Sequence, residues 1–269
     1  MRLSATLVLS LLALAACGGG DDQNRPSSTN PARSTEDVSR SPQETLAAVQ
    51  DAVRGAESFH IEGTQTDDDG VARLEADVAA DGAVRLALRQ KGAVVDMIVL
   101  DQESVYIRAD EAFWAQSSAS ADVQELLTGR WVKVPGDEDA AELAQQVQPN
   151  VVADCLGESV GTLSAREDKL DGDEVVVLAD EGDKPGTAPG ELFVKADDPA
   201  LPLRVTQTGA RRPGGPPVNP KCGSDQDETP QDRSDLRLSR WNEPVEIEAP
   251  PDALDLEEIA GQGEQEPEV

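Results

Sequence analysis

The chain has 269 residues, enough to bury a substantial core in one or two domains. It carries 23 Lys and Arg against 53 Asp and Glu, a formal net charge of -30, and this acidity argues against nucleic acid as a partner. An anionic bilayer would repel the same charge. Any attachment to a membrane must therefore come from something other than a polybasic surface.

The first 17 residues predict export and lipidation. Arg2 provides a positive start, and residues 7–16 form an apolar run of signal-peptide length, too short to span a membrane. Leu14-Ala15-Ala16-Cys17 resembles the bacterial lipobox, which implies cleavage of residues 1–16 and attachment of diacylglyceryl and palmitate chains at Cys17. The alternative is an ordinary secretion signal with an incidental cysteine. We expect a mature protein anchored to the outer face of the cell membrane without spanning it.

The regions that flank the predicted domain are polar. Residues 17–41 hold Gly, Ser, Thr, Pro, Asn and charged residues with hardly an apolar side chain, so we expect a disordered tether with an end-to-end distance of roughly 25–30 Å. Residues 260–269 read as a disordered acidic tail. A single folded domain is predicted between them, over residues 42–259.

The domain is predicted to open with a helix. Ser41 suits the N-cap, Pro42 the first helical position, and Glu44 completes a capping box. An apolar stripe follows at helical spacing and comprises Leu46, Val49 and Val53. Gly55 is expected to end the helix, whose apolar side should pack on a sheet.

Alternating apolar residues predict strands over residues 59–63, 74–78 and 84–88. Asp67-Asp68-Asp69-Gly70 and Asp81-Gly82 suit the turns of antiparallel hairpins. Residues 94–100 are apolar at both alternations, so one face should meet the core and the other should meet helices or a bound apolar molecule. Further strands are expected at residues 104–108 and 129–135, with helices at 121–127 and 138–147.

The second half of the chain also predicts short strands separated by turns, at residues 162–170, 174–180, 191–195, 201–208 and 235–241. About ten strands with a few helices indicate an α+β domain. The predicted architecture is a strongly curved antiparallel β-sheet, a half-barrel, with a few helices covering its concave face.

Cysteine usage is consistent with export. Once Cys17 is assigned to lipid, Cys155 and Cys222 remain, the number that one disulfide requires in an oxidising compartment. Such a bond would pin the Pro- and Gly-rich loop of residues 211–233 to the domain. Two free thiols or a pair of metal ligands are the alternatives.

The order of these motifs resembles the LppX/LprG family of actinobacterial cell-envelope lipoproteins. The resemblance includes residues 58–63 at the start of the sheet, Val105-Tyr106-Ile107, Gly129-Arg130-Trp131-Val132, and the ending from Trp241 to Asp255. It implies a half-barrel with helices over an apolar cavity that holds lipid acyl chains for transfer across the periplasmic space. The chain departs from the family in its acidity and in the long loop around Cys222.

Catalytic and metal chemistry find little support in the sequence. The one histidine, His60, alternates with Phe59 and Ile61 and is predicted to be an exposed strand residue. The sequence contains neither a nucleophile elbow, nor a zinc-protease motif, nor a phosphate-binding glycine loop. Residues 67–70 fit a turn better than a calcium loop, because the first and twelfth loop positions would be Gln65 and Ala76. We expect no enzyme activity, no cofactor and no metal.

Two functions from different classes remain. The first is an anchored binding protein that takes an apolar, acyl-lipid ligand into a cavity for lipid or glycolipid carriage, with or without an envelope transport partner. The candidate lining is Val78, Leu86, Leu88, Val95, Met97, Val99 and Ile107. The second is a surface-anchored interaction or sensor module whose core is filled by its own side chains. In both cases we expect a monomer.

Overall fold

The computed structural model describes residues 40–68, 70–115, 120–134, 138–156, 160–215, 222 and 232–256. The predicted signal peptide, Cys17, most of the tether and the acidic tail lie outside these residues. Within them, no helix is long and apolar enough to cross a membrane.

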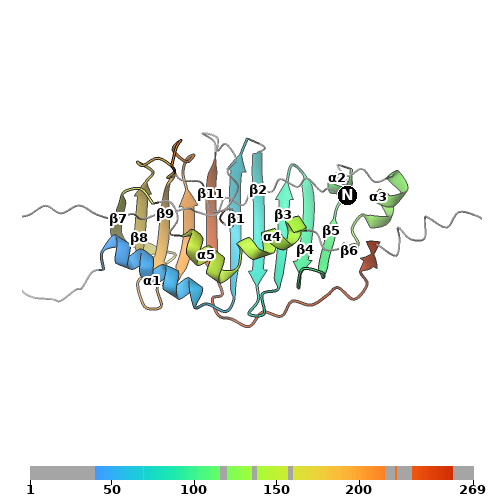
Figure 1. Ribbon diagram of the computed structural model, residues 1–269, viewed down its shortest axis with the longest axis horizontal. Helices are drawn as coiled ribbons and strands as arrows, with labels where there is room; N and C mark the ends of the chain where they lie inside the picture. Colours follow the sequence, from blue (N-terminus) through green and yellow to red (C-terminus); the bar gives the residue numbers. More distant parts are fainter. Residues whose placement is uncertain are drawn as a thin grey trace, which may run out of the picture.

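Twelve strands of the described chain form one sheet, and five helices accompany it (Figure 1). The strands are β1 (Phe59–Asp67), β2 (Gly70–Val78), β3 (Val84–Gln90), β4 (Ala93–Val99), β5 (Val105–Ala109), β6 (Trp131–Val134), β7 (Leu163–Leu170), β8 (Asp173–Glu181), β9 (Pro189–Lys195), β10 (Pro202–Gln207), β11 (Arg233–Ser239) and β12 (Leu254–Asp255). The helices are α1 (Pro42–Arg54), α2 (Glu111–Trp114), α3 (Ala121–Leu127), α4 (Glu138–Gln146) and α5 (Pro149–Cys155).

The strand order is β12-β6-β5-β4-β3-β2-β1-β11-β10-β9-β8-β7, and the sheet is curved without closing into a barrel. The α+β half-barrel predicted from the sequence is confirmed. One detail differs, because β12 pairs with β6 in parallel, which makes the sheet mixed rather than wholly antiparallel. The chain reaches β12 by a long connection after β11, so the hairpin rule, which favours antiparallel pairing of strands joined by tight turns, does not apply to it.

Helix α1 begins as predicted. The Ser41 hydroxyl accepts a hydrogen bond from the Glu44 backbone N–H at 3.3 Å, and the Glu44 carboxylate accepts one from the Ser41 N–H at 2.8 Å. Leu46, Val49 and Val53 are buried on the side that faces the sheet. The helix therefore combines a satisfied N-terminus with an apolar stripe.

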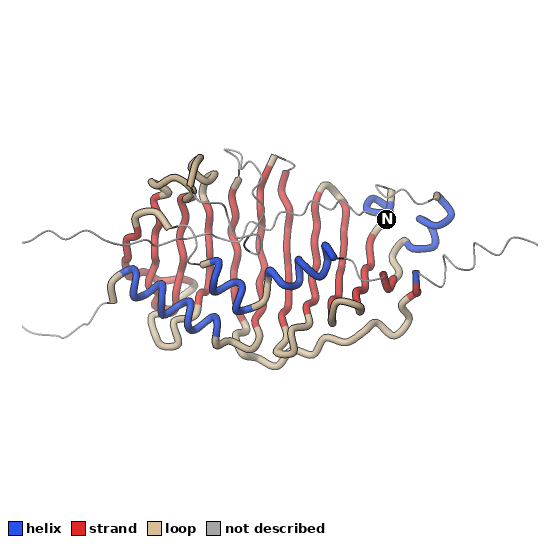
Figure 2. Tube along the Cα trace, in the orientation of Figure 1, coloured by secondary structure: helices blue, strands red, loops and turns tan. Residues whose placement is uncertain are grey.

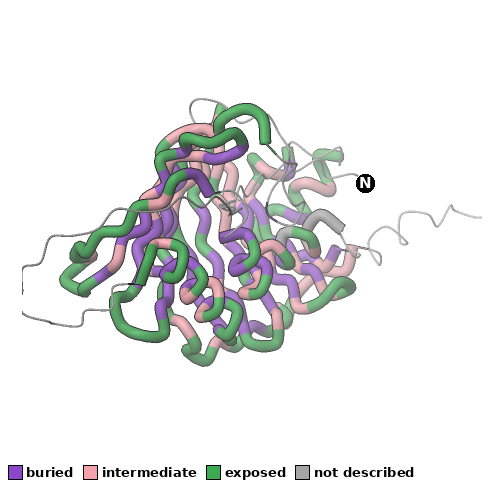
Figure 3. Tube along the Cα trace, turned by 60° about the vertical axis from the view of Figure 1, so that its left-hand side comes forward, coloured by how far each residue is buried: buried purple, intermediate pink, exposed green. Residues whose placement is uncertain are grey.

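Helices α1, α5 and α4 lie across one face of the sheet, which we call the inner face (Figure 2). Side chains from these helices and from ten of the strands share one core, and Figure 3 shows buried residues concentrated in the strands and the helices over them, with exposed residues in the turns. Continuous burial of this kind is the main driving force for such a fold, at about 25 cal/mol per Å² of apolar surface.

The outer face has an apolar cluster of its own at the lower ends of the strands in Figure 1. Ile98 of β4 is buried there together with Ile247, and Val245 packs beside them. Ile247 and Val245 belong to the connection that runs along the sheet from β11 to β12 (Figure 1). The second apolar face of β4 is therefore covered by the chain itself, and the expectation that helices or a ligand cover it is wrong for this part of the strand.

Candidate apolar ligand site

The structure brings the seven candidate lining residues together on the inner face. Cross-strand register places Met97 between Leu86 and Ile107, and Val95 opposite Leu88. Val78 and Val99 are each paired with Val84 of β3, one strand to either side. The face assigned from the alternation is thus the face that the helices cover.

Burial on this face is uneven. On β3, Val84 and Leu86 are buried, whereas Leu88 and Gln90 are half-buried. On β4, Met97 is half-buried although Val95 and Val99 beside it are buried. The helices cross nearer the other end of these strands (Figure 1), so the inner face keeps partly exposed apolar side chains towards the β1–β2 and β3–β4 turns.

A small pocket lies beneath α5. Its lining is apolar and comprises Ile61, Val152, Cys155, Leu156, Pro202, Val205, Leu236 and Leu238. The volume is about 10 Å³, room for one water molecule, whereas a pocket for a lipid-sized ligand measures roughly 300–1,000 Å³. The pocket marks a gap in the packing of α5 on β1, β10 and β11.

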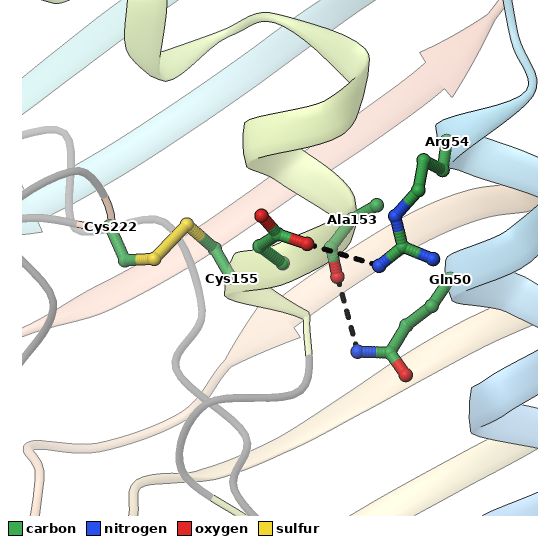
Figure 4. The surroundings of a disulfide bond; sticks show 6 residues. Gln50, Arg54, Ala153, Cys155 and Cys222 are labelled. Atoms are coloured by element: carbon green, nitrogen blue, oxygen red, sulfur yellow. Dashed lines mark hydrogen bonds and ion pairs between the residues drawn. A yellow bond between two sulfur atoms is a disulfide. The ribbon is translucent and has the colours of Figure 1, made fainter.

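The predicted disulfide between Cys155 and Cys222 is present, with a Cα–Cα distance of 5.3 Å. Cys155 is the last residue of α5, and both cysteines are buried. Helix α5 is also bonded to α1, because Gln50 donates to the Ala153 carbonyl at 3.2 Å and Arg54 donates to Asp154 at 3.0 Å (Figure 4). The cover of this end of the sheet is therefore tied on two sides.

His60 does not have the environment predicted from the sequence. It points to the outer face as expected, yet it is buried, with an exposed fraction of 7%. Its Nδ1 lies 2.8 Å from the Asp77 carboxylate, and Arg240 contacts both groups, donating to Asp77 at 2.6 Å. The exposed histidine was a wrong prediction, because alternation gives the face of a strand but not the side chains that cover it.

Ion pairs occupy the outer face of the second half. The Arg204 guanidinium donates two hydrogen bonds to Asp235, at 2.7 and 2.6 Å, and these bonds lower the pKa of Asp235. On the inner side, burial raises the pKa of Asp180, whose oxygens accept hydrogen bonds from the backbone N–H groups of Gly161 and Gly182, both at 2.7 Å. Each of these carboxylates has a structural partner.

Metal ligands do not gather in the described part of the chain, where no group of three or more His, Cys, Asp or Glu side chains could hold an ion. Asp67 and Gly70 pair across the end of the β1–β2 hairpin, as the turn interpretation of this sequence predicts.

The tryptophans have packing roles. Trp241 stacks on Phe59 at 4.9 Å and donates to the Pro202 carbonyl, while Arg108 lies over Trp131.

Sequence reasoning missed α5, which supplies Val152, Cys155 and Leu156 to the pocket. A signal was available, since Pro149 occupies a first-turn position and Val151, Val152 and Cys155 follow at helical spacing. The short length of the helix, seven residues, left that pattern weak.

No protein-family model matches the chain, and no curated protein is similar enough to match. Among solved structures, the Mycobacterium tuberculosis lipoprotein LppX is 15% identical with a TM-score of 0.47, and the match covers 77% of this chain and 98% of LppX. LprF from Mycobacterium bovis is 18% identical with a TM-score of 0.45, covering 79% of this chain and 97% of LprF.

In structure the chain is similar to LppX and LprF, lipoproteins of the LppX/LprG family. At these identities the likeness concerns the fold, and what the chain binds must be argued from its own residues.

Proposed function

We propose that this protein is an exported lipoprotein, anchored through Cys17, that binds an apolar ligand with acyl chains on the inner face of its sheet and carries it within the cell envelope. The folded domain of residues 42–259 holds the ligand, the tether of residues 17–41 gives it reach, and the acidic tail follows. Binding involves no catalysis. Its driving force is transfer of acyl chains from water or membrane onto aliphatic side chains.

The observation that carries the proposal is the half-burial of Leu88 and Met97. Both lie on the inner face, among side chains that are fully buried, and both leave apolar surface for a further molecule to cover. The disulfide between Cys155 and Cys222 supports export, because such bonds persist in oxidising compartments. The lipobox and the net charge of -30 support attachment by acyl chains rather than by basic residues.

One observation favours a second candidate, an anchored interaction or sensor module with a filled interior. The pocket beneath α5 has room for about one water molecule, so the packing at that end of the sheet is close to that of an ordinary protein core. For the first candidate, the binding protein, the same close packing beneath α5 means that a bound acyl chain would lie towards β3 and β4, away from α5.

The test is lipid recovery from the purified protein. The full chain, with Cys17→Ser to remove the anchor, is exported from an actinobacterial host and examined by native mass spectrometry, followed by solvent extraction and lipid analysis. We expect a co-purified lipid in near-stoichiometric amount. In the variant Leu88→Gln/Met97→Gln the amount should fall at least tenfold, since two polar amides replace apolar contacts on the proposed site.

Val71→Gln is the matched control. Val71 lies on the outer face and is 59% exposed, so the same change from apolar to polar should leave the bound lipid unchanged. Thermal unfolding of each variant checks that it is folded. The opposite outcome is an unsubstituted protein that purifies without lipid and takes up neither added fatty acids nor added phospholipids. That result would refute lipid binding and favour the interaction module.

A further inference from the structure

A row of polar side chains crosses the inner face beside the half-buried apolar residues. Cross-strand register places Gln207 opposite Ser234, Ser234 opposite Gln65, and Ala72 between Gln65 and Gln90. By strand alternation these residues share the face of Val205, Leu236, Ile61 and Leu88. We call Gln65, Gln90, Ser234 and Gln207 the polar rim. It lies one row closer to the turns than Leu88 and Val95.

Two side chains of the polar rim have hydrogen-bonding groups that are not used within the described part of the chain. Gln65 and Gln90 are half-buried, and neither side-chain amide makes a hydrogen bond to the described residues. Gln207 differs, since its amide donates to the Gly209 carbonyl at 2.9 Å. A free amide offers two donors and one acceptor, and partial burial makes a partner for these groups favourable. Gln65 and Gln90 can therefore bind a polar group that arrives beside Leu88.

The charge of the surroundings selects the kind of polar group. The rim contains amides and one hydroxyl, with neither Lys nor Arg among its residues. Lys91, in the turn after Gln90, already has an interaction partner. Gly190 on β9 lies opposite Gln207, and Asp180 on β8 lies opposite Gly190, so Asp180 belongs to the same row. Its carboxylate accepts hydrogen bonds from two backbone N–H groups. An anionic group would find no free cation in the rim, and a cationic group would find no free carboxylate there.

We propose that the polar rim binds the headgroup of the ligand, and that this headgroup is uncharged and bears hydroxyl groups, as in a monoacylglycerol. The acyl chain lies over Leu88 and Met97, and the hydroxyl groups exchange hydrogen bonds with the amides of Gln65 and Gln90. This inference rests on the proposed function, since it assigns one end of the ligand within the same site.

The experiment is a competition between lipids of equal chain length. The full chain carrying Cys17→Ser is incubated with equimolar 1-monooleoylglycerol, methyl oleate and oleoyl-lysophosphatidylglycerol, and native mass spectrometry gives the ratio of the three complexes. We expect the monoacylglycerol complex to dominate. In Gln65→Leu/Gln90→Leu its advantage over methyl oleate should fall about tenfold, the loss expected for two hydrogen bonds of ordinary strength.

Thr64→Val/Thr66→Val is the matched control, because these residues alternate with Gln65 on β1 and point to the outer face. It should keep the preference of the unsubstituted protein. Equal binding of monooleoylglycerol and methyl oleate, or preference for the lysophospholipid, would overturn the rim proposal while leaving lipid binding intact. Failure of all three lipids to bind would instead overturn the proposed function, and the headgroup site with it.

Discussion

Gly63 lies where the backbone of β11 closely approaches that of β1. A Cβ atom at this position would come within 2.0 Å of the Asp235 carbonyl oxygen and 2.9 Å of the Leu236 Cα, both in the backbone of the neighbouring strand. Backbone atoms cannot move aside as a flexible side chain can. The absence of a side chain is therefore a condition for the central pairing of the sheet, which joins its two halves.

We predict that Gly63→Ala lowers the free energy of unfolding by about 3 kcal/mol, because overpacking of this kind forces the two strands apart. Urea unfolding followed by circular dichroism measures the change. Thr64→Ala, on the opposite face of the same strand, is the control and should alter the stability by no more than about 0.5 kcal/mol. Equal stabilities for the two variants would contradict the role assigned to the close approach.

Residue environments were the least predictable feature from sequence. Alternation separated the face of His60 from the face of the seven candidate lining residues, whose role in binding stays a prediction. It could not show that Asp77 and Arg240 bury His60, because these partners lie 17 and 180 positions along the chain. The polar rim was missed for the same reason, since four residues from four strands become neighbours only through the register of the sheet.

At the scale of elements, local signals decided what could be predicted. Helix α1 was predicted because its capping box and apolar stripe are both contained in one short stretch. The hairpins followed from Asp and Gly at the turns. The cover over the outer face of β4 comes from a segment more than 140 residues later, so the local sequence of β4 could indicate only that some cover is needed.

The disulfide is the link between α5 and a distant part of the chain. It encloses 67 residues, and on the loop-entropy model it should contribute about 4 kcal/mol to stability by restricting the unfolded chain. We predict that Cys155→Ala/Cys222→Ala lowers the free energy of unfolding by about 2–4 kcal/mol, measured from the urea midpoint. Alanine suits these sites because both cysteines are buried beside Val151 in an apolar cluster.

Reduction supplies an independent check on this prediction. A reducing agent added to the unsubstituted protein before unfolding should lower the midpoint to that of the double variant, and should leave the double variant unchanged. An unsubstituted protein whose midpoint equals that of the variant under oxidising conditions would show that the bond contributes nothing to stability.

At the scale of the whole molecule, the net charge and the proposed lipid anchor would make opposite contributions to membrane attachment. A net charge of -30 repels an anionic bilayer, and exposed ion pairs such as Arg54–Asp154 do not offset an excess of thirty carboxylates. The acyl chains that we propose on Cys17 would have no such dependence, because each buried CH₂ group contributes about 0.8 kcal/mol whatever the salt concentration. The two modes of attachment therefore respond differently to ionic strength.

We predict that the full-length protein stays in the membrane fraction of its host through a wash with about 1 M NaCl, which reduces the Debye length to about 3 Å and removes electrostatic attachment. Cys17→Ser should move the protein to the soluble fraction, as followed by immunoblotting, whereas Ser28→Ala in the tether should not. Retention of Cys17→Ser in the membrane would mean that another part of the chain makes the attachment. Release of the unsubstituted protein by salt would mean that the attachment is ionic, despite the acidity of the chain.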